Sequence, residues 1–93
     1  MWQVVQHRGL RKRIAKLPRE VVERYVKWID IIQQSGPSGL RGIKGFRDEA
    51  LSGEWEGHRS SRLNLQYRVI YRIERQEVQV FVIDVNAHDY SRR

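Results

Sequence analysis

The sequence predicts an α+β domain in which a helical hairpin packs on a small four-stranded sheet, in the order β-α-α-β-β-β. Three patterns lead to this expectation. Residues 18–34 carry apolar side chains three or four positions apart, as on one face of a helix. Residues 59–73 alternate apolar and basic side chains, as strands do, and residues 78–85 are apolar on both faces.

The N-terminal part supplies one strand and two helices. Residues 2–7 are short and β-prone, which indicates a first strand. Residues 8–16 are strongly basic with apolar positions at helical spacing, which indicates a short amphipathic helix. Pro18 restarts the chain, because proline is tolerated in a first helical turn and breaks a helix interior. The second helix should end at Gly36-Pro37, so the two helices can form a hairpin over one face of the sheet.

Residues 35–45 have a glycine at every third position from Gly36 to Gly45. That spacing imitates a collagen repeat, but it is far too short for a triple helix, and we expect a mobile loop. The alternative to a functional loop is a plain connector. The basic residues here suit an adaptable rim around a polyanion: Arg41, Lys44 and Arg47.

A hairpin between residues 59 and 73 organises the C-terminal part. Its strands, 59–65 and 67–73, are joined around residues 64–66. Leu63 and Leu65 should share one side of the first strand, whereas Arg62 takes the other. In the second strand Arg68 points away from the apolar face. The last strand, 78–85, should lie inside the sheet because both its faces are apolar.

Ninety-three residues predict a single domain covering residues 1–93, with a modest core. A composition of 40% hydrophobic and 31% charged residues fits a globular protein. No apolar run is long enough to span a membrane, and the first residues lack the pattern of a signal peptide. The absence of cysteine favours a reducing cytoplasm.

The formal charge of +7 and the pI near 10.4 predict attraction to a polyanion, which could be nucleic acid, an acidic protein or an anionic membrane surface. The clustering of the arginines favours nucleic acid or an acidic protein. A charge that only keeps the protein soluble is the alternative. The basic first helix adds candidate RNA contacts, although such a helix face is usually only solvated: Arg11, Lys12 and Arg13.

A set of side chains suited to RNA chemistry should converge on the sheet. Arg62 and Arg68 lie on the polar face of the hairpin, Glu49 enters it, and His88 with Tyr90 leaves the last strand. RNA cleavage by its own 2′-hydroxyl needs a base, cations that stabilise a dianionic phosphorane, and an acid for the leaving oxygen. Such a reaction requires no metal and no organic cofactor. The three histidines show no metal-ligand spacing.

A string of short motifs then resembles the RelE/ParE superfamily of bacterial toxins from type II toxin-antitoxin systems. The likeness is greatest to the YoeB- and YafQ-like ribonuclease branches, and it covers nearly the whole chain. In order, the matching pieces are Leu51-Ser52-Gly53, Trp55, Gly57, Arg59, Arg62-Leu63, Tyr67-Arg68-Val69-Ile70-Tyr71 and His88-Asp89-Tyr90.

The resemblance implies a RelE-like fold with a helical hairpin on a mostly antiparallel sheet. It further implies an mRNA interferase that enters the ribosomal A site and cuts translated messenger RNA in the bacterial cytoplasm. A cognate antitoxin protein would neutralise it, and the complex of the two would bind operator DNA.

Residue roles follow from the same resemblance. Arg62 and Arg68 would bind and stabilise the scissile phosphate, and His88 would act as general acid or phosphate contact. Tyr90 would stack on a base or orient the substrate. Glu49 stands where the YoeB-like branch has its general base. The YafQ-like pattern instead expects a histidine near Arg62 and an aspartate near residue 66, and neither is present.

Two other functions fit the same likeness. One is a ParE-like inhibitor that binds DNA gyrase without cutting RNA. The other is an inactive module that binds RNA or an antitoxin. The arginines also have an ordinary alternative, because strand arginines often form surface ion pairs, here with Glu74, Glu77 or Asp84. Trp55 follows a glycine turn, which favours a structural anchor over a base-stacking platform.

Overall fold

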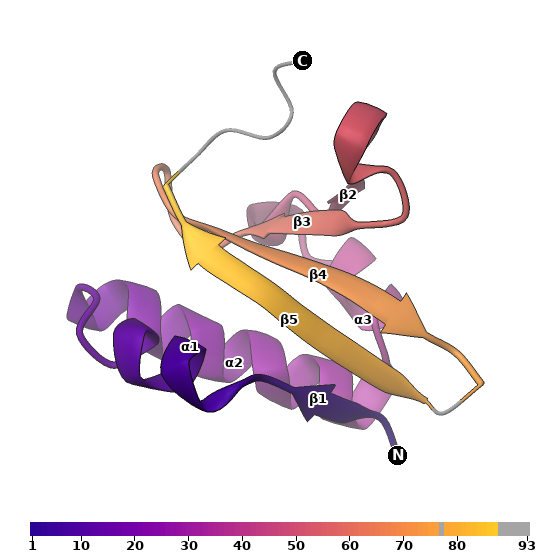
Figure 1. Cartoon of the computed structure of the whole chain (residues 1–93), viewed down its shortest axis with the longest axis horizontal. Coiled ribbons are helices and arrows are strands. Elements are labelled where there is room, and N and C mark those ends of the chain that lie inside the picture. The colour runs from indigo at the N-terminus through magenta and orange to yellow at the C-terminus, as the bar shows by residue number, and fades with distance from the viewer. Residues whose placement is uncertain (77, 88–93) are drawn as a thin grey trace.

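The computed structural model of the chain describes residues 1–76 and 78–87. Two main helices pack on a twisted five-stranded sheet (Figure 1). The strands are β1 (Gln3–Val5), β2 (Glu49–Ala50), β3 (Arg59–Arg62), β4 (Arg68–Glu74) and β5 (Gln79–Asn86). The helices are α1 (Arg8–Ile14), α2 (Arg19–Ser35) and the short α3 (Ser38–Arg41), with 3₁₀ turns η1 (Lys44–Phe46) and η2 (Gly53–Trp55).

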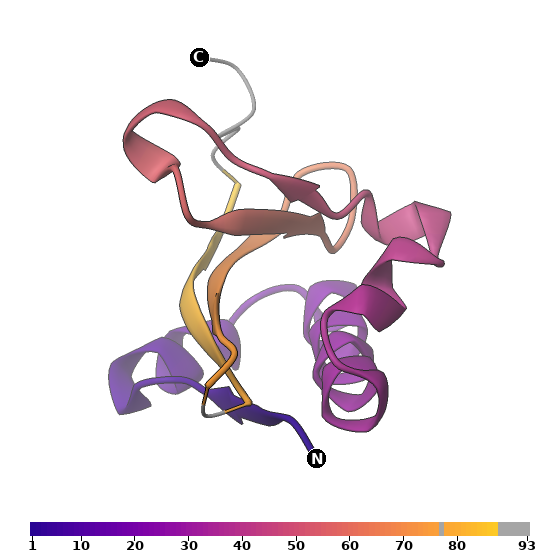
Figure 2. The same cartoon turned by 90° about the vertical axis from the view of Figure 1, so that its right-hand side faces the viewer.

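The sheet is mixed and mostly antiparallel, in the order β1-β5-β4-β3-β2. Among the strands in the described residues, only β1 and β5 form a parallel pair. The last strand lies between β1 and β4, which confirms the prediction of an internal strand. Figure 2 shows the twist from β1 at one end to β2 and β3 at the other. The sheet has one strand more than the four predicted. The additional strand, β2, was missed because its two residues are both exposed and show no alternation of apolar and polar side chains.

One core joins both main helices to the sheet. From α2 it takes Tyr25, Trp28 and other apolar positions at helical spacing, and from α1 it takes Leu10 and Ile14. The strands contribute Val69, Tyr71, Val80, Val82 and Val85, all nearly inaccessible to solvent. Burial of this apolar stripe is what holds α2 on the sheet, since helix propensity alone supplies little stability.

The opposite face of the sheet carries a smaller cluster. Ile70 lies between Val69 and Tyr71 in β4, so it points away from the helices. It packs with Leu51, and the partly buried Trp55 and Ile83 lie against this pair. The Trp55 ring also makes an edge contact with His58 at a centroid distance of 5.4 Å. The position of Trp55 is that of a structural anchor.

The glycine-rich stretch after α2 is folded and packed, which corrects the prediction of a mobile loop. It forms α3 and η1, and Leu40 and Phe46 are completely buried. The Arg24 guanidinium lies 3.9 Å from the centre of the Phe46 ring. Apolar residues also recur at every third position here, ending in Leu40, Ile43 and Phe46, and the glycine period conceals that pattern.

The first hairpin strand is shorter than predicted and ends at Arg62. Leu63 is buried, but Leu65 is 86% exposed, so the expectation that both share the apolar face is wrong. The side-chain oxygen of Asn64 accepts hydrogen bonds from the backbone N–H of Gln66 and Tyr67, at 2.8 and 2.7 Å. This asparagine turn ends the strand and lifts Leu65 into solvent.

No helix in the described ranges is both long and apolar enough to cross a membrane.

Gly36 should not tolerate a side chain. Its φ of 77° and ψ of 175° are accessible almost only to glycine, and an added Cβ would lie 2.5 Å from Trp2 Nε1. We expect Gly36→Ala to lower the free energy of unfolding by about 2–4 kcal/mol, combining backbone strain and overpacking. Urea unfolding followed by circular dichroism measures the change.

Gly42→Ala is the matched control, because Gly42 has a helical φ of −78° and only the Gly39 carbonyl oxygen lies within 4 Å of an added Cβ. Its stability should change by less than about 1 kcal/mol. Equal losses in the two variants would contradict the conformation assigned to Gly36.

Candidate functional site

Arg62 and Arg68 stand directly opposite each other in the sheet. The register of β3 and β4 makes their Cα atoms partners. Side chains in such a pair point to the same face, with Cβ atoms about 5 Å apart. Because Val69 and Tyr71 point to the helices, both arginines project from the other side of the sheet.

An open cleft of about 400 Å³ lies over these arginines. Glu49 of β2 pairs with Ser60, which precedes Arg62 by two positions on the same strand and therefore shares its face. The structure thus brings together three residues singled out from the sequence, Glu49, Arg62 and Arg68. The cleft is lined by Arg47, Asp48, Glu49, Ser60, Arg62 and Arg68.

The cleft concentrates positive charge at some energetic cost. Arg68 is only 9% exposed, and its Nη1 donates a long hydrogen bond of 3.4 Å to the Gln66 carbonyl. The Nε of Arg62 is buried without a hydrogen-bond partner in the described part of the chain. Like charges directly opposite on a sheet are destabilising, and a buried unmade hydrogen bond adds to that cost. An anion between the two guanidinium groups would reduce the repulsion between them.

Asp84 was one of the acidic residues considered as an ion-pair partner for Arg62 or Arg68. In the structure it has a different partner. Asp84 forms an ion pair and hydrogen bond with Arg13 of α1, and it accepts a further hydrogen bond from the Asn86 side chain at 2.5 Å. Arg13 is therefore engaged within the fold.

Asp48 anchors the segment that carries Glu49. Its side chain is completely buried. Oδ1 accepts a hydrogen bond from Arg59 Nε at 2.8 Å and forms an ion pair with Arg59 Nη2 at 2.6 Å. Oδ2 accepts from Ser61 Oγ at 2.6 Å and from the Tyr71 hydroxyl. Trp28 Nε1 donates to the same Ser61 oxygen at 2.9 Å, so the network extends from the residue before β2 through β3 and β4 to α2.

The charge states in this network follow from its surroundings. Burial raises the pKa of Tyr71 well above its ordinary value, and the negative charge of Asp48 raises it further, against a smaller opposing effect of Arg59. Burial alone would lower the pKa of Arg59, but the hydrogen bond and charge of Asp48 outweigh it, and the net shift is upward. The network therefore holds a charged guanidinium and a neutral phenol at physiological pH.

Arg47 and Glu49 flank this anchor on either side. Arg47 has φ 44° and ψ 48°, a left-handed conformation that is uncommon for residues other than glycine. Such a conformation persists when the surrounding structure determines it, and here the next residue is held by an ion pair and several hydrogen bonds. The buried Asp48 thus fixes the backbone that presents Arg47 and Glu49 to the cleft.

Asp48 is not among the site residues predicted from the sequence. A signal was present: Arg59 and Ser61 place polar groups on the helix-facing side of β3, where apolar residues are expected. Buried polar groups need hydrogen-bond partners, so polar residues at these two helix-facing positions indicate an acceptor on a neighbouring segment.

His88 and Tyr90 lie outside the described residues. The described part of β5 ends at Asn86, whose Cα is the partner of Arg68. The other basic candidates are scattered, apart from Arg47 in the cleft. Arg11 lines a groove between α1 and α2, Arg41 lines a separate pocket, and Lys12 and Lys44 are exposed.

Within residues 1–76 and 78–87, no cluster of three or more histidine, aspartate or glutamate side chains could hold a metal ion. The described residues that line the cleft offer guanidinium groups and the carboxylate of Glu49. Arginine forks match the oxygens of a phosphate, and the carboxylate of Glu49 can accept a proton.

No protein-family model and no curated protein matches this sequence. Several solved structures match the fold. The archaeal RelE–RelB complex from Pyrococcus horikoshii contains a chain 22% identical, with a TM-score of 0.71 over 92% of this chain and 93% of that one. The YoeB/ParE toxin from Agrobacterium tumefaciens is 18% identical, with a TM-score of 0.72 over 94% and 99%. A chain of the YoeB–YefM complex from Staphylococcus aureus is 16% identical, with a TM-score of 0.72 over 96% and 99%.

The fold is therefore that of RelE- and YoeB-like toxins over nearly the whole chain. This confirms the resemblance noted in the sequence at the level of the fold.

Replacing the Asp48 carboxylate should destabilise the protein strongly. Asp48→Asn keeps the size of the side chain but leaves Arg59 without its counter-charge. Breaking a buried ion pair at one partner costs about 3–5 kcal/mol, and the partial exposure of Arg59 places the expected loss near the lower end, at about 3 kcal/mol. Chemical unfolding followed by tryptophan fluorescence measures it.

Asp30→Asn serves as the control, since Asp30 is exposed and accepts one hydrogen bond from Gln34. Its effect should stay below about 0.5 kcal/mol. A loss for Asp48→Asn as small as that of the control would refute the anchoring role.

Proposed function

We propose that the protein is the toxin of a toxin-antitoxin pair and acts as a metal-independent endoribonuclease on messenger RNA in the ribosomal A site. One observation carries the proposal: Arg62 and Arg68 face each other across β3 and β4 in a cleft that Glu49 also lines. The RelE-like fold supports it, and Arg62 and Arg68, which belong to the sequence motifs that resemble ribonuclease toxins, line this cleft.

The reaction follows from the arrangement of charge. The phosphodiester lies between the two guanidinium groups, and Glu49 accepts the proton of the adjacent 2′-hydroxyl. The 2′-oxygen then forms a bond to phosphorus, and the bond from phosphorus to the 5′-oxygen breaks. His88 donates a proton to that leaving oxygen. The products are a 2′,3′-cyclic phosphate and a 5′-hydroxyl.

Electrostatic stabilisation is the main contribution of the arginines. Charge on the non-bridging oxygens grows as the phosphorane forms, so preorganised cations bind the transition state more tightly than the substrate. Arg47 adds a third cation at the rim, and Tyr90 stacks on a base next to the cleavage site.

The proposed partners follow from the same assignment. The net charge of +7 attracts the protein to ribosomal RNA and messenger RNA. RelB and YefM accompany toxins of this fold in the solved complexes, and we assign this chain a cognate antitoxin of that kind. Operator DNA is bound only through the toxin-antitoxin complex, and the protein acts in the bacterial cytoplasm.

The cleft residues are tested by cleavage of messenger RNA in a cell-free translation system. Primer extension maps new 5′ ends on the message. We expect codon-phased cuts with the wild type and a loss of about 10²–10³-fold in cleavage rate for Arg68→Ala, which removes a stabilising cation. Glu49→Gln should lose about 10²-fold or more, because the amide cannot accept the proton.

Arg19→Ala is the matched control, since Arg19 is exposed on α2 and pairs only with Glu23 in the described structure. It should cut at the wild-type rate. Wild-type protein that leaves the message intact contradicts the proposal. Inhibited DNA supercoiling with intact message would instead support the gyrase-binding alternative.

A further inference from the structure

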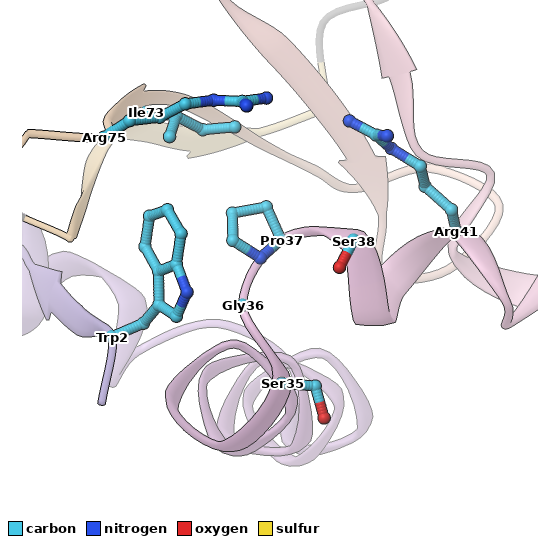
Figure 3. Close-up of a pocket in the computed structure, with 8 residues that line it drawn as sticks. All are labelled: Trp2, Ser35, Gly36, Pro37, Ser38, Arg41, Ile73 and Arg75. Atoms are coloured by element: carbon cyan, nitrogen blue, oxygen red, sulfur yellow. The ribbon is translucent and has the colours of Figure 1, made fainter.

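A second pocket lies at the other end of β4 from the cleft (Figure 3). Its volume is about 240 Å³. Ile73 and Arg75 border it from the end of β4 and the turn that follows, Arg41 from α3, and Trp2 from the segment before β1. Five residues separate Arg68 in the cleft from Ile73 here, which corresponds to about 17 Å along a strand.

Two guanidinium groups approach this pocket from opposite sides. Figure 3 shows the side chains of Arg41 and Arg75 extending toward each other above Pro37. Both residues are exposed, and neither guanidinium has a hydrogen bond or ion pair with any residue in the part of the chain that the structure describes. Converging arginines suit a phosphate, whose oxygens accept forked hydrogen bonds.

The other wall of the pocket is apolar and aromatic. The Trp2 indole lies so close to Gly36 that no Cβ fits between them. The ring also packs against the main core, and the buried Pro37 lies beside it. Trp2 is therefore held in place while part of its surface remains accessible. An aromatic ring held beside cations is the combination that binds an unstacked base together with its phosphate.

The size of the pocket indicates what kind of ligand it takes. Pockets that enclose a free drug-sized ligand usually measure about 300–1,000 Å³. A smaller, half-open pocket suits one unit of a polymer whose remainder stays in solvent. The charge of the site and of the whole chain favours a polyanion over a neutral polymer.

We propose that this pocket binds one nucleotide of single-stranded RNA outside the cleavage site, with the base against Trp2 and the phosphate between Arg41 and Arg75. The choice of RNA rests on the proposed function. The segment from Gly36 to Glu49 contributes residues to both the pocket and the cleft.

Binding of a non-cleavable RNA tests the proposal. The probe is a fluorescently labelled ten-nucleotide RNA with 2′-O-methyl groups, which lacks the attacking hydroxyl, and fluorescence anisotropy reports its affinity. We expect the double variant Arg41→Gln/Arg75→Gln to bind roughly tenfold more weakly or worse. The slope of log affinity against log salt should fall by about 0.7 for each phosphate that the double variant no longer binds.

Two further variants separate stacking from bulk charge. Trp2→Leu keeps an apolar side chain but removes the ring, and it should weaken binding at least fivefold, whereas Trp2→Phe should retain most of the affinity. The control Arg8→Gln/Arg19→Gln removes the same charge from exposed sites on α1 and α2. It should change the affinity less than twofold. Circular dichroism confirms that each variant is folded.

Three results would overturn the proposal: no binding of the probe by the wild type, equal affinities for the Arg41/Arg75 double variant and its control, or unchanged binding by Trp2→Leu. Preferential binding of a labelled ten-residue polyglutamate, lost in the Arg41/Arg75 double variant, would also overturn it in favour of a peptide site. Because the probe cannot be cut, the binding measurement remains interpretable even if the protein does not cleave messenger RNA. Conversely, Arg68→Ala should lower the cleavage rate by about 10²–10³-fold whatever the pocket binds.

Discussion

The buried carboxylate of Asp48 is the interaction on which the arrangement of the molecule depends. It lies between η1 and β2, and its two oxygens bind groups from β3 and β4, while Ser61 links it to Trp28 of α2. A buried charge is tolerated only when its partner and its hydrogen bonds are all supplied. Any movement of the segment before β2 would break several of these interactions together, so this segment has one stable position.

The two faces of β3 and β4 have different roles: one face carries the network around Asp48, and the other carries the arginines of the cleft. On the helix side, Arg59, Ser61 and Tyr71 complete the network around Asp48. On the other side, Arg62 and Arg68 lie together in the cleft. The alternation of side chains along a strand makes this division possible. The residues before and after Asp48 belong to the cleft, so the network also determines which groups line the cleft.

Much of the fold was predictable because periodic burial is visible in the sequence. The face of α2, the internal position of β5 and the shared face of Arg62 and Arg68 all follow from spacing alone. The strand β2 was not predictable, because two exposed residues carry no period. The folded segment of α3 and η1 was concealed by its glycines, although Leu40 and Phe46 anchor it. The role of Asp48 depends on partners 11 to 23 residues away. The polar residues Arg59 and Ser61 indicate that β3 needs a buried acceptor, but no local pattern identifies Asp48 as that acceptor.

The most direct measurement is a crystal structure of the wild-type protein bound to a short RNA whose 2′-hydroxyls are methylated. The account predicts one phosphate within hydrogen-bonding distance of both the Arg62 and the Arg68 guanidinium groups, with Glu49 facing the methylated 2′-oxygen and Asp48 still bound to Arg59. A phosphate backbone that avoids these two arginines, with the cleft empty, would contradict it.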